Sequence, residues 1–450
     1  MTDAAATWNQ DQLALNLPEN WTIQQVAKPE VKPAWADWPD RLAAELSQPS
    51  TGLSLEKLLA ARRGGKIVLI IEDVTRHSPV AQILAVLMRE IRHAGIEDSQ
   101  VGVVFATGMH PDMTLQQARE KLGEEADKLN WRSNPWKDKK AYAPLGDIDK
   151  VPVAIDRGVL DADLRIIVSS VSPHLQAGFG GGYKMILPGC ASIETIRGLH
   201  RQGLGRSATQ LVGMDCDRNP MRIMIDAAGE LVDQTHGKTF AIQYLLDEND
   251  QPAFIAAGEV RPTQRMLAKQ CAVACGVVTT APADVLITNA YPRDFDLWQS
   301  FKGVANTLWA ARPSGIVICV TRCPAGANGM KPPPWPLSPT WTRRVIRAIG
   351  PSALASLVTR IVPSLAGDAA FFVRMACQIC ARNPIFIVSP TLVQEGLKFP
   401  GLHLFANLED AIKAAQHILG KKPQRVTFFP SGGTTFPVPA IPTADRAGED

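Results

Sequence analysis

Histidine and lysine side chains surround one glycine-rich stretch of the sequence. Residues 177–184 carry four glycines within five positions and end at Lys184. His174 lies before this lysine and His200 after it. Backbone N–H groups of a glycine-rich loop can cradle a phosphate, and two histidines beside a small substrate can act as acid and base near neutral pH. A surface turn with an incidental lysine and two solvated histidines is the alternative.

The common phosphate-binding templates do not fit this stretch. A P-loop requires G-x-x-x-x-G-K-[ST], but Tyr183 replaces its second glycine and Met185 replaces its magnesium-binding hydroxyl residue. The dinucleotide fingerprint G-x-G-x-x-G also fails at Tyr183, and Glu194 comes early for a ribose partner. A P-loop ATPase, a nicotinamide Rossmann site and a phosphate-loop transferase are therefore disfavoured.

Two further polar groups follow apolar runs upstream of the glycines. Arg76 and His110 each come shortly after a predicted buried strand. If these strands are parallel neighbours, both side chains gather with His174 and Lys184 at one edge of the sheet, where open α/β sheets bind ligands. Arginine is always charged and can hold a carboxylate through two hydrogen bonds. A salt bridge to Asp73 is the alternative for Arg76.

A second pair of polar residues occurs in the later part of the chain. Gln299 and Lys302 stand three residues apart on a predicted helix that follows an apolar strand. This spacing places an amide and an ammonium group on one helix face. The alternative is an ordinary solvated face.

Alternating apolar and periodic segments predict the elements that position these residues. Short apolar runs predict buried strands, and 3.6-residue periodicity with Pro, Thr or Gly at the ends predicts helices. Strands are expected at 66–73, 101–107, 164–170, 284–289, 315–321, 384–388 and 426–429, and helices at 79–95, 114–122, 189–204, 297–311 and 371–382. Repeated strand–helix units indicate mostly parallel sheets covered on both faces.

The rhythm of these elements predicts two α/β domains. Residues 246–251, with the helix-like 262–275, read as a linker region, so we expect domains at 1–268 and 269–450 with the active site in a cleft between them. The first would bind a cofactor and the second would complete the substrate site. The proline-rich run 331–336 separates two parts of the second domain, and the tail after 437 is expected to be loose.

Composition limits the classes of partner. The 450 residues include 47 Lys plus Arg and 44 Asp plus Glu, a net charge of +3 that argues against a dedicated nucleic-acid binder. No apolar run is long enough to cross a bilayer, and the first residues lack the features of a signal peptide, so a soluble cytoplasmic protein is expected. The eight cysteines, including the Cys377–Cys380 pair, are expected to be buried, inert thiols.

Together the polar blocks resemble the nickel-dependent lactate racemase family, whose members use a nickel-pincer nucleotide. The resemblance covers nearly the whole chain, and several ordered blocks are more specific than any single one. The blocks are Asp73-Val-Thr-Arg76, Thr107-Gly-Met-His110, Pro173-His174, 177–184, Pro188-Gly189, 195–200 and 292–302.

The resemblance implies roles for individual residues. Lys184 matches the lysine that attaches covalently, through a thioamide, to the pyridinium ring of the cofactor (pyridinium-3,5-bisthiocarboxylic acid mononucleotide nickel). His200 matches the protein ligand that completes the planar coordination of nickel beside two sulfurs and one carbon, a geometry that suits Ni(II). His110 and His174 match two acid/base histidines. The matches for substrate binding are Arg76, Gln299 and Lys302, and those for cofactor binding besides Lys184 are Asp73, Thr75, Gly178, Gly180, Gly181 and Gly182.

The implied function is racemisation or epimerisation of a small 2-hydroxy acid, lactate or a related carboxylate. One histidine takes the hydroxyl proton while the α-hydride moves reversibly to the cofactor, and a planar 2-oxo acid then takes the hydride back on its other face. Two bases are needed because each enantiomer presents its hydroxyl on a different side. No nucleic acid or membrane partner is implied, and the oligomeric state stays open.

The sequence also departs from the family pattern. Pro111 follows His110 where other members carry an arginine, and Gly180 and Tyr183 replace other small residues of the glycine-rich loop. These changes leave the side chain of the substrate open. The competing interpretation is a protein that binds a nickel cofactor or nucleotide without catalysis, against which the intact pair of histidines argues.

Overall fold

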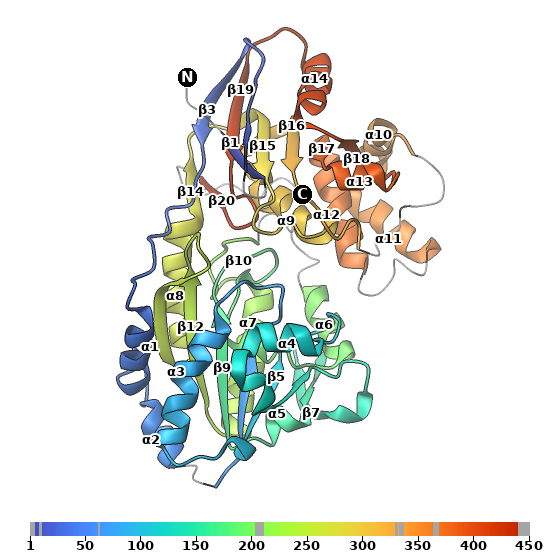
Figure 1. Ribbon diagram of the computed structural model, residues 1–450. Helices are drawn as coiled ribbons and strands as arrows, with labels where there is room; N and C mark the ends of the chain where they lie inside the picture. Colours follow the sequence, from blue (N-terminus) through green and yellow to red (C-terminus); the bar gives the residue numbers. More distant parts are fainter. Residues whose placement is uncertain are drawn as a thin grey trace. The chain divides into compact units, whose positions relative to one another are not determined.

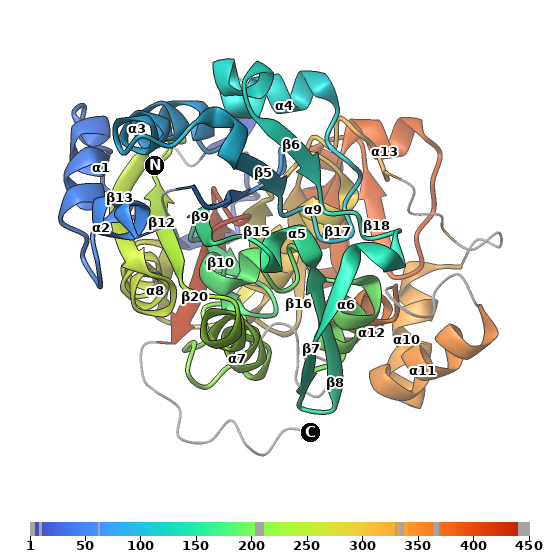
Figure 2. The same cartoon turned by 90° about the horizontal axis from the view of Figure 1, so that it is seen from below.

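The computed structural model describes residues 5–8, 11–61, 64–202, 211–328, 332, 337–362 and 369–439. The chain divides into two compact units (Figures 1 and 2). Unit A comprises residues 31–205 and 214–274, and unit B comprises 1–30, 206–213 and 275–450. The predicted α/β class with mostly parallel sheets is confirmed. No helix among the described residues is long and apolar enough to cross a membrane.

Unit A is built around a six-stranded sheet. Its strand order is β13-β12-β9-β4-β5-β6, and every neighbouring pair is parallel except the β12–β13 pair at one edge. The strands are β4 (Ile67–Ile71), β5 (Val101–Phe105), β6 (Asn130–Ser133), β9 (Leu164–Ser170), β12 (Thr239–Leu246) and β13 (Pro252–Glu259). The chain runs from β4 outward to β6 and then returns to the other side of β4 with β9. The direction of strand order therefore reverses between β4 and β9, which is where such sheets bind ligands.

Helices cover both faces of this sheet because alternate residues of each strand point to opposite sides. Ile67, Leu69 and Ile71 pack with one group of helices, whereas Val68 and Ile70 pack with the other. The first group is α1 (Trp38–Ser47), α2 (Leu55–Ala60), α3 (Val80–His93) and α4 (Leu115–Leu122). The second face carries α5 (Arg157–Leu160), α6 (Ile193–Gln202), α7 (Pro220–Thr235), part of α8 (Val260–Cys275) and the hairpin β7 (Tyr142–Ile148)–β8 (Val151–Asp156).

Unit B contains a second six-stranded sheet, and all of its neighbouring strands are parallel. The order is β18-β17-β16-β15-β19-β3. The strands are β3 (Trp21–Val26), β15 (Ala283–Asn289), β16 (Ala311–Val320), β17 (Ile385–Val388), β18 (Leu402–Phe405) and β19 (Gln424–Phe429). The helices are α9 (Leu297–Thr307), α10 (Pro339–Ile349), α11 (Pro351–Ile361), α12 (Ala369–Arg382), α13 (Pro390–Gln394) and α14 (Leu408–Leu419). Two small pairings complete the unit, β1 (Ala5–Trp8) with β2 (Asp11–Ala14) and β14 (Gly276–Thr279) with β20 (Phe436–Pro439).

One sequence interpretation is wrong. Residues 246–251 are not part of a linker but the turn between β12 and β13, and α8 continues directly from β13. The polar composition that suggested a linker is that of a tight turn, in which Asp247 accepts hydrogen bonds from the N–H groups of Asn249 and Gln251. The predicted domain limits at 268/269 differ from the compact units because β3 pairs with β19.

The structure supports the prediction about the cysteines, whereas the predictions about the proline-rich run and the tail fall largely outside the described residues. The thiols are largely buried, and burial raises the pKa of Cys377 to about 11 and that of Cys380 to about 12, as expected for inert cysteines. Most of the proline-rich run 331–336 and the tail beyond 439 lie outside the described residues.

A fully buried arginine at the start of β9 joins three segments of unit A. The Arg165 guanidinium donates hydrogen bonds to the backbone oxygens of Val159, Ala162 and His236, at 3.1, 2.9 and 2.6 Å. It also bonds the oxygens of Leu160 and Gly237. The bonds to Val159, Leu160 and Ala162 are buried, and a buried carbonyl that loses its donor costs about 1–3 kcal/mol.

We predict that Arg165→Met lowers the free energy of unfolding by more than about 3 kcal/mol, because it leaves several buried carbonyls unpaired. The matched control is Arg89→Met, since Arg89 is exposed and paired only at the surface with Glu90. The control should change stability by less than about 0.5 kcal/mol. Urea unfolding followed by circular dichroism measures both, and equal midpoints for the two variants would contradict the prediction.

Candidate active site

The polar loops of unit A meet at the carboxyl ends of β4, β5 and β9. Residues 72–79 follow β4, residues 106–113 follow β5 and residues 171–192 follow β9. The residues predicted from these loops therefore share one edge of the sheet, at the reversal of strand order between β4 and β9.

Asp73 and His110 are in direct contact across this edge. The Nδ1 atom of His110 lies 2.6 Å from Oδ2 of Asp73. The other carboxylate oxygen of Asp73 accepts from the backbone N–H of Thr75 at 3.0 Å and from its hydroxyl at 2.5 Å. Burial opposes ionisation of Asp73, but the hydrogen bond and charge of His110, the charge of Arg76 and the bond from Thr75 together lower its pKa well below the ordinary value. Asp73 is therefore an ionised acceptor beneath His110.

His110 itself is about half exposed, while its backbone is firmly held. Its side chain has 51% relative exposure, against 8% for that of Asp73. The indole N–H of Trp136 donates to the His110 carbonyl at 3.2 Å. Buried Asn134 donates to the carbonyls of Gly108 and Ala191, at 2.9 and 3.2 Å. These bonds tie the loop that carries His110 to the segment just after Lys184.

Arg76 stands beside this pair on the loop after β4. Its Nη1 atom donates to the hydroxyl of Thr75 at 3.0 Å. The backbone oxygen of Arg76 accepts from Nζ of buried Lys121 at 2.6 Å. Lys121 also donates to the hydroxyl of Ser78 at 3.1 Å, so this loop is fixed at two points.

A buried carboxylate that sequence reasoning missed joins the strands behind the loops. Glu72 accepts from the N–H and hydroxyl of Ser170 at 3.0 and 2.8 Å, and from the phenol of Tyr244 at 3.1 Å. It also accepts from the hydroxyl of Ser78. Glu72 thus links the ends of β4, β9 and β12 at the reversal of strand order. Its place between an apolar run and Asp73 is the only signal for it in the sequence.

His174 lies in a short hairpin after β9. Strands β10 (Pro173–His174) and β11 (Gly178–Phe179) pair antiparallel, with His174 opposite Gly178. The Nδ1 atom of His174 accepts hydrogen bonds from the backbone N–H groups of Gln176 and Ala177, at 3.3 and 3.1 Å. The hairpin therefore fixes which nitrogen of the ring carries a lone pair.

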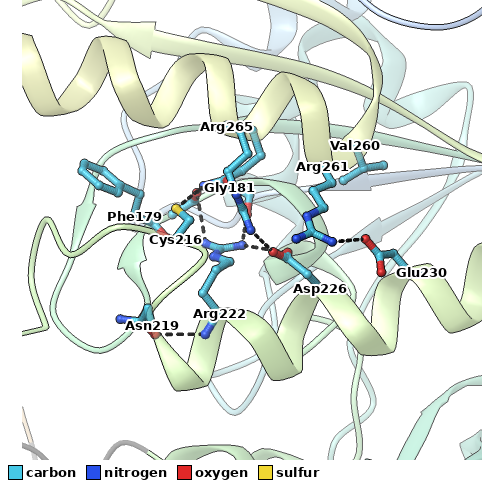
Figure 3. Close-up of polar contacts among 12 residues, drawn as sticks. Phe179, Gly181, Cys216, Asn219, Arg222, Asp226, Glu230, Val260, Arg261 and Arg265 are labelled. Carbon is cyan, nitrogen blue, oxygen red and sulfur yellow. Dashed lines mark hydrogen bonds and ion pairs between the residues drawn. The ribbon is translucent and has the colours of Figure 1, made fainter.

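The glycine-rich loop is held by side chains from α7 and α8. Fully buried Arg222 donates to the carbonyl of Gly181 at 3.1 Å and also bonds that of Phe179 (Figure 3). Gln264 donates to the carbonyl of Gly180 at 3.1 Å. A side chain at position 181 would meet Val171 and Gln243 at 2.7 and 2.8 Å, and the backbone there has φ of +71°. Glycine is thus required at 181 by packing against the protein.

Charge pairs in turn hold the arginine that clamps the loop. Asp226 lies one helical turn after Arg222 and between it and Arg265, at 3.7 Å from Arg222 and 2.6 Å from Arg265 (Figure 3). Arg265 also pairs with Asp217 at 2.8 Å. Such pairing is required because a buried guanidinium without partners would cost several kcal/mol. Sequence reasoning did not single out this pair, although the i, i+4 spacing of Arg222 and Asp226 could have indicated it.

Tyr183 explains why the phosphate-binding templates fail. The ring is buried, packs against Gly229 of α7, and its hydroxyl donates to Asp233 at 2.8 Å. Tyrosine therefore anchors the loop to α7 at a position where a P-loop needs glycine.

Lys184 follows this anchor in a short 3₁₀ turn, η4 (Gly182–Met185). Burial, together with the positive charges of Arg76 and Arg222, lowers the pKa of Lys184 to about 7, although Asp73 acts in the opposite direction. A substantial fraction of its amine is therefore neutral and nucleophilic at neutral pH.

His200 lies in the last turn of α6 and is partly buried. Among the described residues, no group of three or more His, Cys, Asp or Glu side chains could hold a metal ion. Its predicted role as a metal ligand stays a prediction.

Gln299 and Lys302 belong to unit B, on α9. The Nζ atom of Lys302 donates to Oε1 of Gln299 at 2.5 Å, so the two share a helix face as predicted. Asp296 caps this helix by accepting from the N–H of Gln299 at 2.7 Å. The loop before α9 is held by a charge pair between Asp294 and Arg322.

Comparisons with known proteins give relatives in sequence and in fold. Residues 8–211 match the family model described as the lactate racemase N-terminal domain. A curated protein named lactate racemase from Thermoanaerobacterium thermosaccharolyticum is 28% identical over 64% of this chain and 67% of its own length. Another of that name, from Lactiplantibacillus plantarum, is 27% identical over 63% of this chain and 66% of its own length. The alignments thus span about two thirds of these relatives.

Solved structures extend the likeness in fold. The lactate racemase apoprotein from Thermoanaerobacterium thermosaccharolyticum superposes with a TM-score of 0.79 at 22% identity, covering 96% of this chain and 99% of that one. A Thermotoga maritima protein gives a TM-score of 0.62 at 16% identity, covering 89% of this chain and 98% of that one. At these identities the superpositions show a shared fold. Together these comparisons lead to one conclusion: residues 8–211 are similar to the lactate racemase N-terminal domain, and the chain shares its fold with the lactate racemase apoprotein.

Proposed function

We propose that this protein is an isomerase that racemises or epimerises a 2-hydroxy acid, lactate or a related carboxylate. The observation that carries the proposal is the arrangement at the edge of the unit A sheet. Loops that follow β4, β5 and β9 bring Arg76, His110, His174 and Lys184 to one side. A guanidinium can hold a carboxylate, two imidazoles can take and return protons, and a neutral lysine amine can bind a cofactor covalently.

The proposal includes a nickel-pincer nucleotide attached covalently at Lys184. The fit is supported by the chemistry of this lysine, because a pKa of about 7 leaves its amine free to form a bond to carbon at neutral pH. The charges of Arg76 and Arg222 act on the same amine and favour a negatively charged ligand beside it. Lys184 would hold the cofactor covalently, and His200 would supply a nitrogen ligand to the metal. When bound, this cofactor would supply reversible hydride chemistry at the α-carbon of the substrate.

The residues of the chain would then divide the remaining work. Arg76 would hold the substrate carboxylate, since a guanidinium can form two parallel hydrogen bonds to a carboxylate. His110 would take the hydroxyl proton at its Nε2 atom, because its Nδ1 atom faces Asp73. His174 would face the oxygen of the other enantiomer. The backbone bonds of Asn134 and Trp136 would keep His110 in place while its proton moves.

Further parts of the proposal concern residues outside this cluster. Gln299 and Lys302 of unit B would contribute to holding the substrate, as a pair already linked by a hydrogen bond. Asp73 and Thr75, with the glycines at 178 and 180–182, are proposed to lie around the cofactor.

A non-catalytic protein that carries a nickel cofactor or nucleotide is the competing candidate. It needs Lys184 but not the Asp73–His110 pair, which the structure builds from three buried or part-buried hydrogen bonds. This observation favours the enzyme.

We predict that His110→Ala and His174→Ala each lower turnover by about 10²- to 10⁴-fold, the usual contribution of a general acid or base. The enzyme should be made together with a cofactor-producing system and tested by chiral chromatography on a panel of 2-hydroxy acids and sugar acids. Intact mass should show the same adduct in both variants as in the parent chain. Normal turnover in either variant contradicts the two-base scheme.

An isotope experiment tests the transfer of hydride. A substrate with deuterium at the α-carbon should keep its deuterium after inversion in ordinary water, because hydrogen that moves as hydride would not exchange with solvent protons. Mass spectrometry of the separated enantiomers measures it. Loss of deuterium to water would instead indicate a carbanion.

We predict that the amine of Lys184 reacts with an acylating reagent with a half-maximal rate near pH 7, because burial and two arginines disfavour its charged form. Lys66 is exposed and serves as the control, and its rate should follow a different dependence on pH from that of Lys184. Peptide mapping by mass spectrometry between pH 6 and about 10 compares the two. Parallel curves would contradict the shifted pKa.

A further inference from the structure

The two histidines of the candidate site are held by opposite kinds of partner. His110 directs its Nδ1 atom at a carboxylate, whereas His174 directs its Nδ1 atom at two backbone N–H groups. A neutral imidazole has one N–H and one lone pair, so the partner of Nδ1 decides what Nε2 carries.

For His110 the partner is an acceptor. Asp73 is buried, is bonded by Thr75, and has a pKa well below the ordinary value, so it is ionised and cannot donate a proton. The 2.6 Å contact therefore requires the hydrogen on Nδ1 of His110. Its Nε2 atom carries the lone pair and can take a proton. When it does so, the imidazolium keeps its bond to the carboxylate.

For His174 the partners are donors. Backbone N–H groups of Gln176 and Ala177 cannot reverse their roles, so Nδ1 of His174 must carry the lone pair. In the neutral ring the hydrogen then sits on Nε2. A proton added at Nδ1 would face two N–H groups at 3.3 and 3.1 Å, which opposes formation of the imidazolium in this hairpin.

We infer that Asp73 is a positioning residue that fixes His110 as the proton acceptor, while the 173–179 hairpin fixes His174 in the opposite tautomer as a hydrogen-bond donor. This inference rests on the proposed function for the roles of the two rings, and it makes that function unsymmetrical. One enantiomer meets a base that is ready, and the other requires His174 to give up its backbone bonds before it can take a proton.

The asymmetry has a kinetic consequence. Two enantiomers have equal free energy, so kcat/KM must be equal in the two directions of a racemisation. Unequal histidines therefore appear as unequal kcat values, matched by unequal KM values. Asp73→Asn should lower kcat by about 100-fold or more, with a KM change of less than about three-fold, because the amide no longer fixes the hydrogen on Nδ1.

The direct test is the proton position on each ring. Two-bond ¹H–¹⁵N spectra of the full-length chain, labelled at histidine and recorded near pH 8, above the ordinary histidine pKa of about 6.5, distinguish the two neutral tautomers. His110→Gln and His174→Gln assign the signals. We expect the Nδ1–H form for His110 and the Nε2–H form for His174.

Asp73→Asn supplies the second comparison, with Asp147→Asn as the matched control on the exposed strand β7. The first variant should shift His110 toward a mixture of tautomers and leave His174 unchanged, whereas the control should change neither ring. A merely structural role of Asp73 would not move one ring alone. If both wild-type rings carry hydrogen on the same nitrogen, or if Asp73→Asn leaves His110 unchanged, the inference is overturned.

These outcomes separate the inference from the proposed function. Opposite tautomers with no inversion of any 2-hydroxy acid would support the inference and overturn the proposed function. Racemisation by a protein whose two histidine rings share one tautomer would support the proposed function and overturn the inference.

Discussion

The parallel pairing of β4 with both β5 and β9 is the constraint on which the candidate site depends. In a parallel sheet every strand delivers its next loop to the same edge, so segments a hundred residues apart in sequence become neighbours. The reversal of strand order between β4 and β9 leaves the two following loops to diverge there. Glu72 occupies this point and ties β4 to β9 through Ser170. The two adjacent carboxylates thus have different roles: Glu72 links the strands, and Asp73 contacts His110.

Several positively charged side chains are buried, and hydrogen bonds to backbone carbonyl oxygens offset the free-energy cost of burying them. Arg165 and Arg222 are fully buried, and each directs its guanidinium chiefly at carbonyl oxygens. Lys121 does the same for the loop after β4. Carbonyls at loops and helix ends have no partner within their own segment, so one cation can satisfy several of them. By contrast, burial and the positive charges of Arg76 and Arg222 lower the pKa of Lys184. The contrast separates cations that hold the fold from one that is suited to chemistry.

Much of the arrangement was predictable because periodicity and strand ends carry it. The apolar run of β9 was predicted at its observed bounds, and the cap of α4 at Thr114 was also correct. Arg76, His110, His174 and Lys184 were singled out because each follows such a strand. Long-range partners were not predictable: nothing adjacent to Glu72 or Arg222 in sequence announces Tyr244 or Gly181. The turn at 246–251 was mistaken for a linker because turns and linkers share polar residues. The sequence near β3 and β19 likewise contains no pattern that predicts their pairing.

That last pairing bears on how the protein is made. Strand β3 is synthesised near the beginning of the chain, whereas its neighbour β19 emerges about four hundred residues later. Loop-closure entropy grows slowly with chain length, so the folded protein tolerates this separation between paired strands. Because the chain is made from its N-terminus, however, β3 cannot pair with β19 until β19 has been synthesised. During translation β3 must wait on the ribosome without its partner while unit A can already begin to fold. A nascent chain that stalls before β19 therefore exposes an unpaired strand, and such edges invite pairing with other chains.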